Sequence, residues 1–174
     1  MTVHDIRFLG DPVLRDKAKR VPTIDASIRR LIEDMIDSMR AANGVGLAAP
    51  QIGVSLRLIV IGLPDEEPFA LINPEIVKRS GERTVEEGCL SVPGYRTENR
   101  TRSVTVVAKG TDPSGKLVRV RGKDNLLAQA LEHEIDHVNG ILYVDHLESK
   151  DDLIKIEPAP GPKEEPARPS RSGG

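Results

Sequence analysis

The most informative stretch of the chain is residues 124–138, which read DNLLAQALEHEIDHV. Its apolar side chains recur at helical spacing: Leu127, Ala130, Leu131 and Ile135. Because Asn139-Gly140 supplies a stop signal, we predict a helix over 124–138 with Asp124 as its N-cap. His133 and His137 would lie one turn apart on one face of this helix, so their imidazoles point the same way.

The segment His133-Glu134-Ile135-Asp136-His137 fits the HExxH pattern. Two imidazoles on one face can hold a single metal ion, and Glu134 can act as a general base on water bound to it. The ion matters because it lowers the pKa of that water toward about 7. HExxH also arises by chance in helices that bind nothing, but two of the chain's 4 His occupy this one turn.

Two His ligands and a water leave one tetrahedral position for a third protein ligand. His146 has the wrong spacing for the longer metzincin motif, and the segment that carries Glu148 and Glu157 is too short for a well-formed following helix. Cys89 is the better candidate, since it lies in a polar, Gly-flanked turn. A lone Cys is more often a small buried hydrophobe. A nucleophilic Cys–His pair is another alternative, but it leaves the second His and Glu134 without a role.

The rest of the chain predicts a small mixed fold. A helix over 26–42, capped by Asp25 or Ser27, is indicated by six apolar residues on one face: Ile28, Leu31, Ile32, Met35, Ile36 and Met39. Extended segments are predicted over 56–61, over 69–72 with a turn at Asn73-Pro74, over 104–107 and 117–121 as a hairpin, and over 141–144. We expect an α+β fold, with small, mostly antiparallel sheets packed around a central helix that carries HExxH.

Composition excludes several classes of protein. The 174 residues carry 25 Lys+Arg against 27 Asp+Glu, a net charge of -2, which argues against a general nucleic-acid binder or a membrane-surface protein. No apolar run approaches the roughly 20 residues of a membrane span, and the start lacks a signal peptide. One cysteine cannot form an internal disulfide, which predicts a cytoplasmic protein. We expect one domain over 1–157 and a disordered Pro/Gly-rich tail over 158–174.

A third segment, GVGLAAPQIG over 44–53, is rich in small residues. Small side chains allow a substrate backbone to approach closely. The segment is not a phosphate loop, because no Lys-Ser/Thr pair follows it and because it succeeds a helix rather than a strand. Its plainer interpretation is a helix C-cap that leads into a strand.

Three motifs together resemble the peptide deformylase family: GVGLAAPQ over 44–51, EGCLS over 87–91 and HEIDH over 133–137. They occur in the same order as in the family, and the resemblance covers roughly residues 3 to 150. It implies a metal-dependent hydrolase that removes the formyl group from the N-terminal N-formylmethionine of newly synthesised polypeptides and releases formate. Two alternatives are a zinc endopeptidase, which needs a carboxylate third ligand, and a non-catalytic metal-binding protein, which has no use for Glu134.

The resemblance also implies roles for individual residues. Metal ligands would be Cys89, His133 and His137. Glu134 would take a proton from the bound water, while the Gln51 side chain and the Leu90 N–H would hold the developing oxyanion. Substrate-binding positions would be Val45, Gly46, Val85, Glu87, Gly88, Leu126, Gln129 and Ala130. The family Arg that pairs with Glu87 falls on Arg100 or Arg102, and we favour Arg100 as structural support.

Cofactor and partners follow from the same resemblance. It implies one divalent ion per chain, Fe(2+), with Zn(2+), Ni(2+) or Co(2+) as substitutes, although the ligand types alone would suggest zinc. The expected partners are N-formylmethionyl nascent peptides and the ribosome near its exit tunnel. The long C-terminal helix that some members use at the ribosome is missing, which weakens that expectation. We see no nucleic-acid recognition motif and expect a monomer that does not bind membranes.

Overall fold

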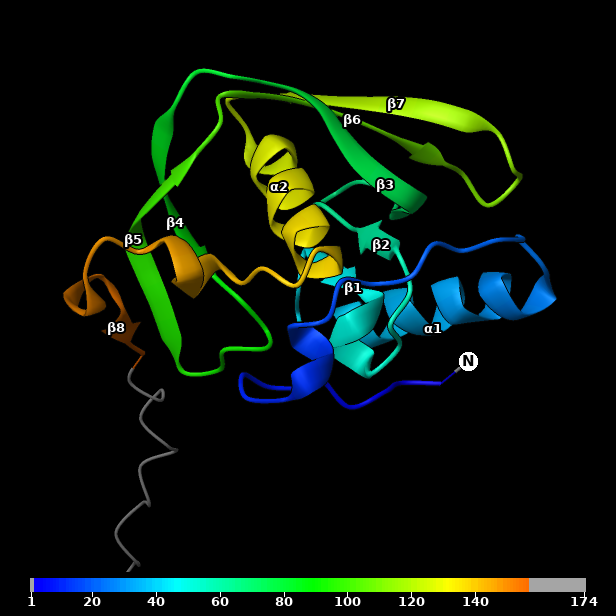
Figure 1. The fold of residues 1–174 in the computed structure, drawn as a ribbon, viewed down its shortest axis with the longest axis horizontal. Helices are drawn as coiled ribbons and strands as arrows, with labels where there is room; N and C mark the ends of the chain where they lie inside the picture. Colours follow the sequence, from blue (N-terminus) through cyan, green and yellow to red (C-terminus); the bar gives the residue numbers. More distant parts are fainter. Residues whose placement is uncertain (1, 157–174) are drawn as a thin grey trace, which may run out of the picture.

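The computed structural model describes residues 2–156. Its centre is a five-stranded antiparallel sheet in the order β1-β2-β3-β6-β7 (Figure 1). The strands of this sheet are β1 (Gly46–Ala48), β2 (Leu58–Ile61), β3 (Phe69–Ser80), β6 (Thr105–Thr111) and β7 (Leu117–Lys123). A second antiparallel sheet has the order β4-β5-β8 and consists of β4 (Arg83–Gly88), β5 (Tyr95–Arg102) and β8 (Ile154–Lys155). The predicted tail, 158–174, lies outside the described residues.

Two helices, α1 (Ala26–Ala41) and α2 (Leu126–Val138), pack against opposite faces of the five-stranded sheet. The strand β2 shows this in its alternation: Ile59 and Ile61 pack with α2, whereas Leu58 and Val60 pack with α1. All four are fully buried, so this strand is apolar throughout rather than alternating with polar residues. The predicted α+β fold, with antiparallel sheets around a central helix, is therefore confirmed.

The helix α2 begins at Leu126, two residues later than predicted, and its N-cap lies one residue later than predicted. Asn125, not Asp124, is the N-cap, and its side chain accepts a hydrogen bond from Ala128 N at 3.0 Å. An N-cap needs extended backbone, which Asn125 has at φ -145°, whereas Asp124 is left-handed at φ 49°. At the other helix, Asp25 is the cap of α1, as predicted, and accepts from Ile28 N at 3.0 Å.

Two further predictions of local structure were wrong. Asn73-Pro74 does not end a strand, because β3 continues through it with a register shift between Ile72 and Glu75. The predicted extended piece over 141–144 gives way to a 3-10 turn, in which Asp145 accepts from Leu142 N at 2.9 Å. Short 3-10 turns are Pro12–Leu14, Ala49–Ile52, Tyr143–His146 and Lys150–Asp152.

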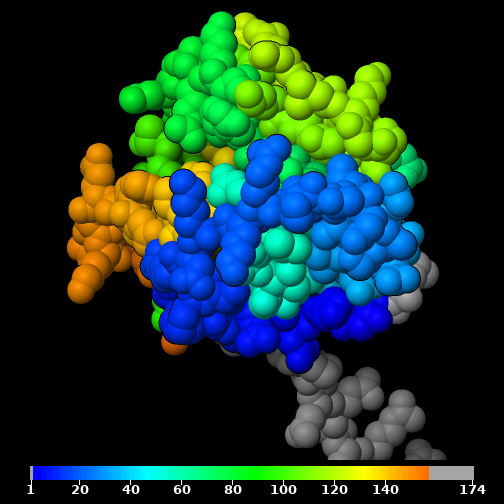
Figure 2. Space-filling view, turned by 45° about the vertical axis from the view of Figure 1, so that its right-hand side comes forward, coloured from blue at the N-terminus to red at the C-terminus, as the bar shows by residue number. Residues whose placement is uncertain are grey.

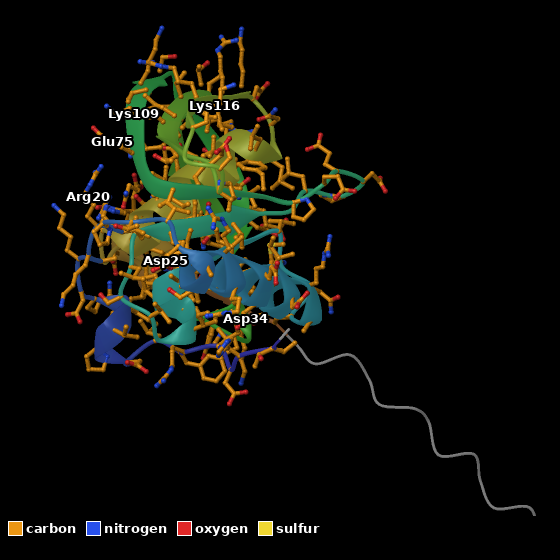
Figure 3. The ribbon with its side chains drawn as sticks, turned by 90° about the vertical axis from the view of Figure 1, so that its right-hand side faces the viewer. Arg20, Asp25, Asp34, Glu75, Lys109 and Lys116 are labelled. Atoms are coloured by element: carbon orange, nitrogen blue, oxygen red, sulfur yellow. The ribbon has the colours of Figure 1, made fainter. Side chains whose placement is uncertain are left out.

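The N-terminal segment is tied to α1 through Asp34. Its carboxylate accepts from Thr2 N at 3.0 Å and lies 3.1 Å from His4 Nε2. Figure 2 shows this segment in dark blue along the lower edge of one face, below α1, and Figure 3 shows Asp25 and Asp34 along the same helix. No helix within residues 2–156 has both the length and the apolar character required to cross a bilayer.

Candidate active site

Three potential metal ligands meet where α2 faces the turn after β4. The Cys89 Sγ lies 3.3 Å from His137 Nε2, which lies 3.2 Å from His133 Nε2. Bond lengths of about 2.0–2.1 Å to nitrogen and about 2.3 Å to sulfur place tetrahedral ligand atoms about 3.3–3.6 Å apart. The two observed separations lie near the lower end of this range, and all three ligand atoms lie within 4.8 Å of one another. Among residues 2–156 these three side chains are the one such group of three, and it does not include Glu148.

His133 is oriented by a buried carboxylate. Its Nδ1 lies 3.0 Å from Glu87 Oε2, which fixes the tautomer that leaves Nε2 free to bind a cation. Glu87 in turn receives two hydrogen bonds from Arg102, at 2.6 and 2.8 Å, and Arg102 also donates to Asp136 at 2.8 Å. The side chains of Arg102 and Glu87 are only 2% and 3% exposed and that of Asp136 is 13% exposed, so a largely buried chain of ionic contacts holds the His133 imidazole in place.

Our choice of Arg100 as the partner of Glu87 was wrong. Arg100 instead donates to Thr101 O at 2.6 Å, and its nearest carboxylate oxygen, on Asp136, is 3.9 Å away. Arg100 and Arg102 point to the same face of β5, because they are two residues apart. Only the position of α2 and a register shift between Val85 and Glu87 decide which guanidinium reaches the carboxylate.

The charges around the cluster favour a cation. Burial alone would raise the pKa of Glu87, but hydrogen bonds and charges from His133 and Arg102 hold that pKa well below its usual range. Burial opposes protonation of His133, yet Cys89 and Glu87 outweigh it and raise its pKa. Burial and the neighbouring His133 lower the pKa of His137, which keeps its imidazole neutral as metal binding requires.

Glu134 points from α2 toward the glycine-rich segment. Its Oε1 lies 3.9 Å from His133 Nε2, and its Oε2 is buried with no hydrogen-bond partner among the described residues. Burial raises the pKa of Glu134 to about 7, close to the value that suits a general base near neutral pH. Gly46 makes room for it, because a Cβ at this position would lie 2.6 Å from Glu134 Oε1.

Gln51 is held in the site by its own hydrogen bonds. Its Oε1 accepts from Ala48 N at 2.9 Å, and its Nε2 donates to Ser91 Oγ at 3.1 Å and lies 3.6 Å from Cys89 Sγ. Leu90 follows Cys89, and its N–H has no acceptor within the part of the chain that the structure describes. Two donors therefore lie close to the three potential ligands.

A cleft of about 630 Å³ opens onto this cluster. Seven of the eight predicted substrate-binding residues line it: Val45, Gly46, Glu87, Gly88, Leu126, Gln129 and Ala130. Val85 does not. The sequence reasoning missed four contributors: Ser91, which binds Gln51; Tyr143, whose ring stacks on His133 with centroids 6.3 Å apart; and Tyr95 and Ile156, which line the cleft. Of these, only Ser91 had a local signal, since it lies within the EGCLS motif.

A Cys–His–His cluster beside a buried carboxylate, at the floor of a cleft, defines a metal-dependent hydrolase. Comparison with known proteins gives the family. Residues 3–152 match the family model described as polypeptide deformylase. The peptide deformylase of Dehalococcoides mccartyi (strain CBDB1) is 58% identical over 159 residues, which cover 91% of this chain and 94% of the relative. The chain belongs to the peptide deformylase family.

Solved structures agree with this assignment. The crystal structure of a peptide deformylase from Legionella pneumophila is 50% identical, with a TM-score of 0.81, and the match covers 84% of this chain and 87% of that one. A peptide deformylase from Synechococcus elongatus, solved in complex with actinonin, is 41% identical with a TM-score of 0.82; the match covers 86% of this chain and 81% of that one. The protein is a metallohydrolase that removes the formyl group from the N-terminal formylmethionine of newly synthesised polypeptides.

Proposed function

We propose that Cys89, His133 and His137 hold the metal ion of this deformylase. The proposal rests chiefly on the meeting of one thiol and two imidazole nitrogens at 3.2–3.3 Å. When bound, a divalent ion supplies Lewis acidity, which lowers the pKa of a coordinated water toward about 7. Fe(2+) is our proposal for the ion in the cell, with Zn(2+), Ni(2+) or Co(2+) as substitutes, since one thiolate and two imidazoles suit all four.

Glu134 acts as the general base in this proposal. Its buried carboxylate takes a proton from the attacking water and passes it to the amine nitrogen that leaves when the formyl C–N bond breaks. A pKa near 7 suits both steps, because the group must accept and release a proton at neutral pH. The missing side chain at Gly46 leaves the space that this carboxylate occupies.

Gln51 and Leu90 stabilise the oxyanion that forms when the formyl carbon is attacked. The Gln51 amide is preorganised by its hydrogen bonds with Ala48 N and Ser91 Oγ, so Nε2 presents its second hydrogen toward Cys89 without further rotation. The Leu90 N–H is available because no other described group takes it. Donors fixed in advance contribute more than mobile ones, since they need no reorganisation during the reaction.

The substrate occupies the cleft with its methionine side chain against apolar positions near the cluster: Val45, Leu126 and Ala130, beside Gln129. Gly46 and Gly88 allow the substrate backbone to lie close to the strands as an added extended segment. The proposed setting is the cytoplasm, where Cys89 stays reduced. There the protein acts as a monomer whose catalytic domain spans residues 1–157, and it meets nascent chains near the ribosomal exit tunnel.

Metal analysis combined with formate release from a formyl-Met peptide tests these roles. Cys89→Ala should lose the metal, whereas Glu134→Gln should keep it and lose about 10²–10⁴-fold in turnover. Glu148→Gln is the matched control, because Glu148 is an exposed carboxylate outside the cluster. Metal retained in Cys89→Ala but lost in Glu148→Gln would overturn the ligand set in favour of one with a carboxylate.

A further inference from the structure

The last described residues of the chain form part of the wall of the active-site cleft. The strand β8 pairs with β5, with Lys155 opposite Tyr95, and Ile156 N donates to Gly94 O at 2.8 Å (Figure 1). This pairing joins the C-terminal segment to the turn that follows Cys89. Ile156 is thereby placed on the lining of the cleft, far in sequence from the three family motifs.

Several exposed apolar side chains line the cleft. Tyr95, Leu126 and Ile156 are 39%, 40% and 46% exposed, and all three line it. The other large exposed apolar side chains of the described residues do not line it: Val3, Phe8, Leu9, Val77 and Leu117. Exposed apolar side chains that line one cleft indicate a place where a partner is bound. Here the partner is the substrate, since these side chains share the cleft with Cys89, His133 and Glu134.

The charge at this part of the cleft is compensated. Arg96 also lines the cleft, but its guanidinium contacts Glu86 at 3.2 Å and Glu98 at 2.8 Å. A cation paired with two carboxylates offers little attraction to an acidic substrate residue. Apolar burial is therefore the main contribution that Tyr95 and Ile156 can make to binding.

We propose that Ile156 and Tyr95 form an apolar contact site for the residues that follow formylmethionine in the substrate. The inference rests on the proposed function, because the methionine must first occupy the pocket near Ala130 and Leu126. From there the polypeptide leaves the cleft past the turn to which Ile156 is bonded. The C-terminal strand thus makes the enzyme favour substrates with an apolar second or third residue over those with glycine or an acidic residue.

Steady-state kinetics with a matched peptide series tests this site. The series is formyl-Met-Gly-Gly, formyl-Met-Leu-Gly, formyl-Met-Gly-Leu and formyl-Met-Asp-Gly, with metal-loaded wild type and Ile156→Ala. For wild type, kcat/KM for the preferred of the two leucine peptides should exceed kcat/KM for formyl-Met-Gly-Gly by about fivefold, mostly through a lower KM. This is the factor expected from burying about 40 Å² of apolar surface. Ile156→Ala should reduce this ratio to about twofold or less, and Ile156→Leu should restore it.

Because the ratio is taken within each protein, it does not depend on the fraction that is active. Lys155→Ala is the control, since Lys155 is an exposed neighbour on β8 that does not line the cleft; it should keep the wild-type ratio. An unchanged ratio in Ile156→Ala, or no leucine preference in wild type, overturns the inference. No hydrolysis of formyl-Met-Gly-Gly by metal-loaded wild type would instead overturn the proposed function.

Discussion

Replacing Arg102 by methionine should destabilise this protein far more than the same change at Arg100. The guanidinium of Arg102 makes two hydrogen bonds to Glu87 and one to Asp136, with only 2% of its side chain exposed. Its removal leaves the buried carboxylate of Glu87 and the partly exposed carboxylate of Asp136 without their main partner. Breaking a buried ion pair in this way costs about 3–5 kcal/mol.

Arg100 is the matched control because it is also buried but poorly paired. Replacing Arg100 by methionine removes one hydrogen bond to Thr101 O, which contributes about 0.5–1.5 kcal/mol to the free energy of unfolding. Its Asp136 contact is long, at 3.9 Å, and its Nε has no partner among the described residues. Urea unfolding of both variants with metal removed measures the difference, which should also appear as a fall in Tm of roughly 10 °C for Arg102→Met.

Replacing Arg102 should weaken metal binding as well. Without Arg102, Glu87 no longer holds His133 in one orientation, so metal affinity in a chelator competition should fall about 10–100-fold. Arg100→Met should leave the affinity nearly unchanged. Equal losses in the two variants, in stability and in affinity, would refute the reasoning that Arg102 supports the site.

The stability gap also has a predicted pH dependence. The folded-state pKa of Glu87 lies below its usual value, so the stability that it contributes is present above its unfolded pKa of about 4.3 and is lost as the pH falls toward the lower folded value. The difference in free energy of unfolding between wild type and Arg102→Met should therefore become smaller as the pH falls below about 4. A gap that widens below pH 4 would contradict this assignment of charge.

Three further changes give separate tests. Gly46→Ala should lower formate release at least tenfold at unchanged metal content, because its Cβ would displace the Glu134 carboxylate; full activity would contradict the close approach. Gln51→Leu should lower kcat about 10²–10³-fold with little change in KM, and a loss confined to KM would argue against an oxyanion donor. Burial raises the pKa of Glu134 to about 7, so its charge costs stability above its unfolded pKa of about 4.3. In urea unfolding of the metal-free protein, the free energy of unfolding of Glu134→Gln should therefore rise relative to that of wild type between pH 5 and pH 8. A difference in unfolding free energy that does not change over this pH range would contradict the raised pKa of Glu134.

The two helices could be predicted from sequence because their apolar residues repeat with helical period over more than two turns. Strands β4 and β5 could not, since they consist mostly of Arg, Glu and Thr. Their inward positions hold charged groups such as Glu87 and Arg102, which are buried through pairing rather than through apolar character. Binary hydrophobic patterning has no signal for a strand of that kind.

The proposed metal ligands were accessible to sequence reasoning because HExxH has a fixed geometry on a helix and the chain has one thiol. Choosing between Arg100 and Arg102 required the register of β4 on β5, which a bulge shifts by a residue. Ile156 reaches the cleft only through the pairing of β8 with β5. A contact between segments so distant in sequence leaves no local pattern.

The most direct test of the central claim is formate release from a formyl-Met peptide as anaerobically prepared, metal-free protein is titrated with ferrous iron. We predict that release rises in proportion to bound iron and stops rising at one ion per chain, and that Cys89→Ala binds too little iron to follow this curve. Release by the metal-free protein at the full rate, or an undiminished curve for Cys89→Ala, would contradict the account.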